Sequence, residues 1–199
     1  LAEEFGTPLF IVSENQLRRN VNQFRDAFQK HWRGGKVDVL PAIKANWILA
    51  TRKVLSEEGA GADVYSYGEL FAALEAGVEP GLISVNGGGK QEDLIRLCIE
   101  KEVRTTVEDL DEPEMINRIA GELGKKAKIR FRVKPDYPSL YKPTDFAQEK
   151  VSIDIGIQVY KSGIPAQYLP ELGREVLKMP NIEMVGIHFH GGRHNPSLW

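Results

Sequence analysis

The sequence predicts an α/β protein whose strands form a parallel sheet, and three observations support this expectation. Short apolar runs of strand length alternate with helical patterns over most of the chain. The first five runs recur roughly every 20–25 residues, which is the spacing of consecutive βα units. The chain has 199 residues and is 42% hydrophobic, which is enough to bury one sizeable core.

The individual elements follow from this alternation. An apolar pattern at residues 7–12 predicts a short first strand, and Ser13 with Gln16 three residues later predicts a capping box at the start of a helix. The strands of the sheet are expected at residues 37–43, 62–65, 82–85, 103–107, 128–133 and 184–189. Helices are expected between them at residues 49–58, 68–76, 91–101, 111–123 and 166–179.

The number of strands predicts an incomplete TIM-like (β/α)8 barrel. A complete barrel has eight strands and typically about 250 residues, whereas about six strands are expected here in 199 residues. We therefore expect residues 1–199 to be the N-terminal part of a longer protein. The stretch 134–165 has little strand character and carries four prolines. A connection of that length is more often functional than idle.

Composition excludes several classes of function. Lysine and arginine total 26 against 28 acidic residues, a formal net charge of -2, which leaves no basic footprint for nucleic acid or an anionic membrane. The sequence contains no apolar run long enough to span a bilayer. The single cysteine, Cys98, lies in an apolar helical pattern and cannot form an internal disulfide. A buried structural thiol and a cytoplasmic setting are expected.

Lys44 is the first candidate for chemistry because it stands directly after the apolar run 39–43. The C-terminal ends of the strands carry the chemistry in βα-repeat proteins. A partly desolvated lysine at such a place can act as an amine nucleophile. The carbonyl compound that it would hold, through a Schiff base, is pyridoxal phosphate (PLP). The structural alternative is a solvated loop lysine, which is the commoner fate of a single lysine after a strand.

Two strings in register around Lys44 resemble the signatures of one family. P-A-I-K-A-N at residues 41–46 resembles Y-A-V-K-A-N, and G-A-D-V-Y-S-Y-G-E-L at residues 61–70 resembles G-x-D-V-x-S-x-G-E-L. These signatures belong to the fold-type III PLP-dependent decarboxylases, which include diaminopimelate, ornithine and alternative arginine decarboxylases. The resemblance implies a barrel of the alanine racemase type, with the remaining strands and a C-terminal β-domain absent from this chain.

The resemblance also implies the roles of five residues. Lys44 would form the Schiff base with PLP, and Asp63 would lie close to it. Arg132 corresponds to the arginine of an L-R-I-N-P segment. The segment H-F-H-G-G-R at residues 188–193 resembles H-F-H-x-G-S, and its second histidine, His190, would stack on the cofactor ring. Arg193 stands where the family has a serine that contacts the cofactor phosphate. A guanidinium there could pair with the phosphate or could equally point at an acidic substrate.

Several of these residues have structural alternatives when they are considered one at a time. Asp63 could be a turn or capping aspartate. Ser66 and Glu69 could be the two members of a capping box. Arg130 and Arg132 share a face of their predicted strand and could be solvated at a strand edge, or could point into the barrel and need partners there.

Two further patterns are weaker. The glycine-rich segment 86–90 could cradle a phosphate because glycines let the backbone approach a ligand, but a tight structural βα loop is the better interpretation. His188 and His190 share a strand face and suggest a metal site, yet two imidazoles without a carboxylate or a third ligand argue against one. No metal is expected. Pro41 is a further departure from the family pattern, since the family has tyrosine there.

The predicted function is decarboxylation of an amino acid, diaminopimelate-like or basic, by a PLP-dependent carboxy-lyase with Lys44 and His190 as catalytic residues. A fold-type III racemase and a non-catalytic homologue that regulates a partner are the alternatives. The resemblance implies a homodimer in the full-length protein, with a small amino-acid substrate and no nucleic-acid or membrane partner. The other cofactor-binding segments of the family would lie beyond Trp199, so residues 1–199 alone are expected to be inactive.

Overall fold

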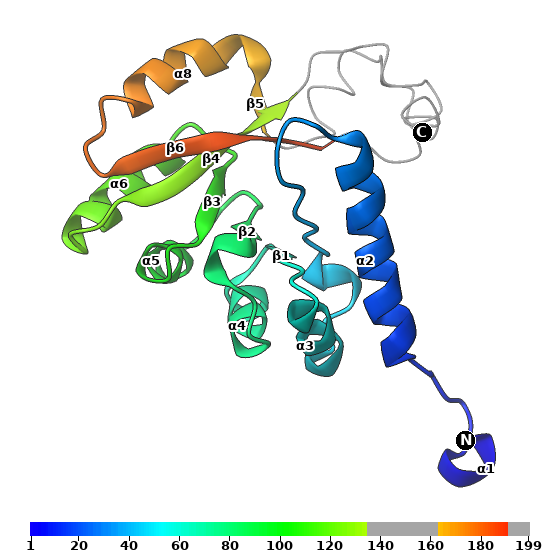
Figure 1. The fold of residues 1–199 in the computed structure, drawn as a ribbon. Helices are drawn as coiled ribbons and strands as arrows, with labels where there is room; N and C mark the ends of the chain where they lie inside the picture. The colour runs from blue at the N-terminus through cyan, green and yellow to red at the C-terminus, as the bar shows by residue number, and fades with distance from the viewer. Residues whose placement is uncertain (135–162, 191–199) are drawn as a thin grey trace, which may run out of the picture. The chain divides into compact units, whose positions relative to one another are not determined.

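The computed structural model describes residues 1–134 and 163–190, and the chain divides into two compact units (Figure 1). Unit 1 comprises Leu1–Val64 and Gly68–Ile83, and unit 2 comprises Tyr65–Tyr67 and Ser84–Trp199.

Unit 1 is built around the long helix α2 and the shorter helix α3. Ser13 caps α2, since its hydroxyl accepts the backbone N–H of Gln16 at 3.3 Å, so this part of the predicted capping box is confirmed. Val21 of α2 and Leu55 of α3 are buried together. The elements of this unit are α1 (Ala2–Phe5), α2 (Glu14–His31), η1 (Ile43–Ala45), α3 (Leu49–Glu57), β1 (Ala62–Val64), α4 (Tyr67–Glu75) and η2 (Pro80–Leu82).

Two predicted strands of unit 1 are corrected. Residues 7–12 form no regular element, and Phe10 is 97% exposed. An apolar pattern becomes a strand only where its backbone finds hydrogen-bond partners. The strand expected at 37–43 is reduced to a short pairing with β1, through an isolated bridge between Ala42 and Asp63. Pro41 limits this pairing because it has no N–H to donate, and Ile43 already belongs to the turn η1.

Unit 2 is a parallel sheet with helices on one face. Strand β3 pairs with β2 and β4, while β4 also pairs with β5 and β6, always in parallel. The strands are β2 (Ile83–Val85), β3 (Arg104–Val107), β4 (Ala127–Lys134), β5 (Ile164–Pro165) and β6 (Ile182–Phe189). The helices are α5 (Glu92–Glu100), α6 (Glu112–Glu122), the turn η5 (Ala166–Tyr168) and α8 (Leu169–Val176).

Strand β4 shows how the sequence separates the two faces of this sheet. Its residues alternate, so Ala127, Ile129 and Phe131 share one face. These three are buried in one cluster with apolar residues of α5, α6 and α8. Arg130 and Arg132 therefore lie on the face opposite the helices. The predicted parallel α/β class is confirmed, and the polar face of the sheet is where a site can form.

Smaller differences from the predicted elements have local causes. The helix expected at 166–179 is a 3-10 turn followed by α8, with a proline in the first turn of the helix, where a missing N–H costs least. The predicted burial of Cys98 is confirmed, because it is fully buried in α5 and burial raises the pKa of its thiol to about 11. Among the described residues, no helix combines the length and apolar character needed to cross a membrane.

Candidate functional site

Lys44 lies in η1, immediately after the backbone that pairs with β1. The N–H of Gly61 donates to the carbonyl of Val39 at 2.9 Å, and the N–H of Asp63 donates to that of Pro41 at 3.4 Å. The bridge from Asp63 reaches Ala42, two residues before Lys44. The strand of Asp63 is therefore paired with the backbone segment that leads into Lys44.

The environment of Lys44 differs from the expected one. A partly buried amine is predicted, whereas the Lys44 side chain is exposed and Asp63 is half-buried. The turn η1 begins at Ile43, so Lys44 lies after the backbone that pairs with β1 and not within it. Ile43 is the buried member of this turn, with 1% of its surface exposed.

The polar face of unit 2 holds Arg130 and Arg132 with partners for both. Arg132 is 5% exposed, and its Nη1 lies 2.8 Å from Oε2 of the buried Glu108. Arg130 donates from Nε to the hydroxyl of Thr106 at 2.8 Å, and from Nη2 to Ser84 and Asn86. The solvated-edge alternative is wrong for Arg132, because each buried charge needs a partner and this one has it.

Glu108 and Glu112 are buried acidic residues beside Arg132 and the loop 86–90 that the sequence patterns did not indicate. Glu108 follows β3 directly, and its Oε1 accepts the backbone N–H of Gly87 at 2.6 Å. Glu112 accepts the backbone N–H of Glu108 and pairs through Oε1 with the ammonium of Lys90 at 2.8 Å. The available signal was an acidic residue at a strand end followed four residues later by a second one.

These contacts distinguish the two interpretations of the glycine-rich loop 86–90, a structural βα loop and a phosphate-binding loop. Gly87 has φ 96° and sits against the ring of Tyr65, where a Cβ would lie 2.7 Å from a ring carbon, so only glycine fits. The Lys90 side chain is 1% exposed and is committed to Glu112. The geometry supports a structural βα loop rather than a phosphate cradle.

His188 and His190 lie at the end of β6 in unit 2. His188 is the ladder partner of Arg132, and its Nδ1 has no hydrogen-bond partner among the described residues. Burial, together with the charges of Arg130, Arg132 and His190, lowers the pKa of the His188 imidazole to about 4. The described residues contain no group of three or more His, Cys, Asp or Glu side chains placed to hold a metal ion.

The predicted site residues thus fall in three places. Lys44 and Asp63 belong to unit 1, while Arg132 and His190 belong to unit 2. Arg193 lies outside the described residues.

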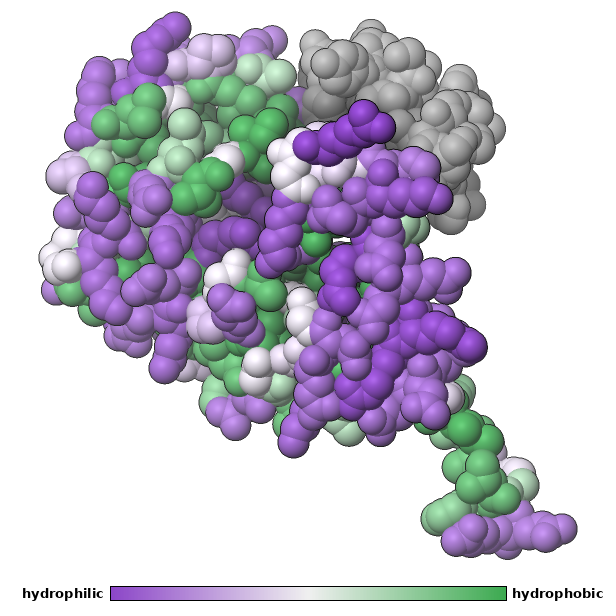
Figure 2. Space-filling model, in the orientation of Figure 1, coloured by the Kyte–Doolittle hydropathy of each residue, from purple (hydrophilic) through white to green (hydrophobic). Residues whose placement is uncertain are grey.

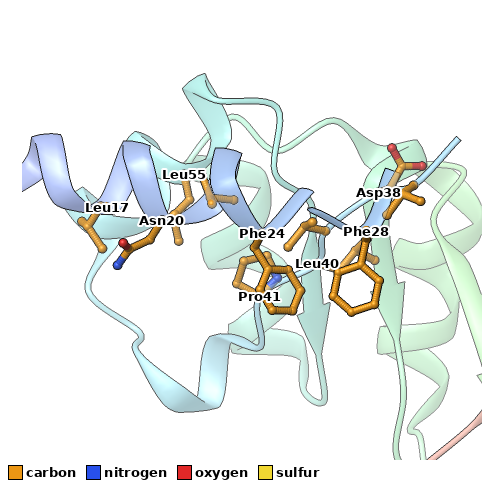
Figure 3. Close-up of a pocket in the computed structure, with 11 residues that line it drawn as sticks. Leu17, Asn20, Phe24, Phe28, Asp38, Leu40, Pro41 and Leu55 are labelled. Carbon is orange, nitrogen blue, oxygen red and sulfur yellow. The ribbon is translucent and has the colours of Figure 1, made fainter. Parts of the chain in front are cut away.

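An apolar groove of about 570 Å³ opens between α2 and the segment 37–41 in unit 1 (Figure 3). Phe24 and Phe28 line it, with ring centroids 4.8 Å apart. Of its two polar lining residues, Asp38 is paired with Lys36 at 2.8 Å. Lys44 is not among the lining residues, so this groove is separate from the candidate chemistry.

Comparison with known proteins extends this local picture. A family model described as the pyridoxal binding domain of pyridoxal-dependent decarboxylases matches residues 14–195. The chain is 34% identical over 192 residues to diaminopimelate decarboxylase of Archaeoglobus fulgidus, covering 96% of this chain and 42% of that protein. It is 36% identical over 193 residues to the Aquifex aeolicus enzyme of that name, covering 96% and 43%.

Solved structures show the same relationship in three dimensions. The crystal structure of diaminopimelate decarboxylase from Methanocaldococcus jannaschii, in complex with L-lysine, matches with a TM-score of 0.82 and 33% identity, covering 95% of this chain and 43% of that one. The chain therefore spans less than half the length of these relatives. The extent of the family match indicates pyridoxal phosphate as the cofactor, and the chain belongs to the pyridoxal-dependent decarboxylase family, matching its pyridoxal-binding domain.

Proposed function

We propose that this chain is the pyridoxal-binding part of a PLP-dependent amino-acid decarboxylase in which Lys44 holds the cofactor. The observation that carries the proposal is the position of Lys44, an exposed residue directly after backbone paired with the strand of Asp63. The match of the pyridoxal-binding family model over residues 14–195 supports it.

The residues present fit this cofactor. An accessible primary amine can bind an aldehyde, and Asp63 on the paired strand is a carboxylate suited to a cationic partner. In unit 2, the Nε of Arg132 is buried without a hydrogen-bond partner among the described residues, which leaves a donor for an anionic or polar ligand. When bound, PLP supplies an electron sink for the bond that breaks at Cα of an amino acid.

Each proposed site residue would then have a separate role in holding the cofactor. Lys44 would attach the cofactor, and Asp63 would favour positive charge next to that amine. Arg132, oriented by Glu108, would present its Nε–H to the bound group. His190 would pack against the cofactor ring, and Arg193 would pair with its phosphate. Lys44 and His190 are thus the proposed catalytic residues.

The substrate is proposed to be diaminopimelate or a similar basic amino acid, because the relatives named above are diaminopimelate decarboxylases. A homodimer in the full-length protein and a cytoplasmic location complete the proposal. The buried Cys98, the single cysteine of the chain, fits a reducing compartment.

The test uses the full-length natural protein incubated with PLP, reduced with borohydride and mapped by peptide mass spectrometry. We expect a phosphopyridoxyl group on Lys44, and none at that peptide in Lys44→Ala. Release of CO2 from diaminopimelate should fall on the order of 10³-fold in the same variant. A matched control is Lys53→Ala, an exposed lysine on α3, which should keep both the label on Lys44 and the activity.

Each outcome has a distinct meaning. A label on Lys44 with racemisation and no CO2 would replace decarboxylation by racemase chemistry. A folded protein without a label on Lys44 would overturn the proposal.

A further inference from the structure

Arg52 is a buried arginine whose side chain donates three hydrogen bonds to the backbone around Lys44. It lies in α3 and is 3% exposed. Its Nε donates to the carbonyl of Asn46 at 2.9 Å, its Nη1 to that of Pro41 at 2.8 Å, and its Nη2 to that of Ala42 at 3.2 Å. The three carbonyls flank Lys44 on both sides, so one guanidinium spans the turn that carries it.

The hydrogen bonds within the turn itself are few. Within η1 and its C-cap, the N–H of Ala45 donates to Ala42 at 3.3 Å and that of Asn46 donates to Ile43 at 3.0 Å. A single 3-10 turn has poor hydrogen-bond geometry and is easily deformed. The Asn46 side chain accepts the N–H of Ile48 at 3.1 Å and stiffens the exit of the turn.

Arg52 also connects this turn to β1. The carbonyl of Pro41 accepts both the Arg52 guanidinium and the N–H of Asp63. The segment before Lys44 is therefore fixed from α3 on one side and from the Asp63 strand on the other. A planar guanidinium suits this task because its donors diverge in a rigid fork, whereas a lysine ammonium is a single point on a flexible stem.

The charge of Arg52 is buried, and its surroundings partly compensate for that burial. Burial lowers the pKa of the guanidinium, and the charge of Glu69 opposes that shift. The three carbonyl acceptors are the groups that compensate a buried cation here. Each of its three nitrogens donates to a backbone carbonyl, so the side chain is committed to the turn.

We propose that Arg52 is the positioning residue for Lys44: it sets the backbone of the turn that presents the amine to the cofactor. This inference rests on the proposed function for its catalytic consequence, but its structural part concerns the protein without cofactor. Arg52 acts through the backbone and touches neither the cofactor nor the substrate in this assignment.

The experiment compares Arg52→Met and Arg52→Lys with Lys53→Met in the full-length natural protein. Lys53 is the next residue of the same helix and is exposed, so Lys53→Met removes the same charge without reaching the turn. The first readout is amide hydrogen exchange of the PLP-free protein over residues 41–48. We expect exchange to accelerate about tenfold in Arg52→Met, since several hydrogen bonds are lost together, and to stay unchanged in Lys53→Met.

The second readout is the PLP concentration that half-saturates borohydride-trapped label on Lys44. It should rise about tenfold in Arg52→Met, with Arg52→Lys between the two because one ammonium can replace only part of the fork. In the decarboxylation assay kcat should fall while KM for the amino acid stays within about twofold, as expected for a residue that does not bind substrate.

The outcomes separate this inference from the proposed function. Unchanged exchange and unchanged PLP dependence in Arg52→Met would overturn the assignment of Arg52. Faster exchange at residues 41–48, in a protein whose Lys44 takes no label even in the wild type, would keep the structural role and overturn the proposed function. If Arg52→Met does not fold, Arg52→Lys decides alone: wild-type exchange and PLP dependence there would contradict the proposal.

Discussion

Arg130 and Arg132 show how charged residues of one strand are matched by partners on the polar face of the sheet. Both lie on the polar face of β4, and each is matched by groups from neighbouring strands or their ends. Arg132 pairs with Glu108, which also accepts the N–H of Gly87. One carboxylate therefore positions both an arginine and a loop, because its two oxygens can serve different donors.

His188 is the residue whose protonation should be visible in solution. Its folded-state pKa of about 4 lies below the ordinary value of about 6.5. The unfolded chain therefore binds the proton first as the pH falls. The contribution of the neutral His188 imidazole to the free energy of unfolding is fully present above about pH 6.5. It is lost as the pH falls from about 6.5 to 4. Because the ring is only half-buried, solvent screening reduces the expected loss to about 1–2 kcal/mol.

The measurement is urea unfolding of the full-length protein at pH 7 and at pH 4.5. His188→Gln should lose less stability over this interval than the wild type, by about 1 kcal/mol. His31→Gln, at the exposed end of α2, is the control and should behave as the wild type. An equal pH dependence in His188→Gln and wild type would show that the imidazole charges normally in the fold.

The loop after β2 and the start of α6 are held together by the ion pair of Lys90 with Glu112. Both side chains are nearly inaccessible, at 1% and 6% exposure. The second oxygen of Glu112 accepts the backbone N–H of Glu108 at 2.7 Å. Removing one partner leaves the other charge buried and unpaired, which costs far more than breaking an exposed pair.

A double-mutant cycle tests this coupling between elements. Lys90→Met and Glu112→Gln should each lower the free energy of unfolding by about 3–5 kcal/mol. The double variant should lose clearly less than the sum, because no unpaired charge remains. Arg118→Ala, which breaks the exposed pair with Glu122 on α6, should cost no more than about 1 kcal/mol. Additive effects of Lys90→Met and Glu112→Gln would contradict a direct energetic link.

The molecule as a whole exposes apolar side chains that folded proteins normally cover. In β6 alone, Ile187 is 68% and Phe189 is 65% exposed, while Phe10 near the N-terminus is 97% exposed. Figure 2 shows hydrophobic residues at the surface around α1 and in the region of β6 and α8. Exposed apolar surface favours association with further protein.

We therefore predict that a polypeptide of residues 1–199 alone self-associates and releases no CO2 from diaminopimelate in the presence of PLP. The chain spans less than half the length of the relatives that it matches. Light scattering and a CO2 assay, run beside the full-length natural protein, measure the two effects. A monodisperse, active 199-residue polypeptide would show that these residues are sufficient.

Several features of this protein were determined by local sequence. The alternation of strand and helix patterns predicted β3, β4, α5 and α6 within one or two residues, because hydrophobic period depends on neighbours in the chain. The capping of α2 by Ser13 and the burial of Cys98 followed from similarly local signals. The two strings around Lys44 indicated the family without any structure.

Other features were decided only by tertiary structure. Residues 7–12 carry a strand pattern but form none, since a strand exists only through its partners. The partners of Arg132 and Lys90 are 24 and 22 residues away, and no periodicity links them. In the sequence Arg52 is an ordinary helical residue, yet in the fold its side chain donates to three backbone carbonyls around Lys44. The physical reason is the same in each case: pattern follows from chain neighbours, whereas burial and pairing depend on which distant segments the fold brings together.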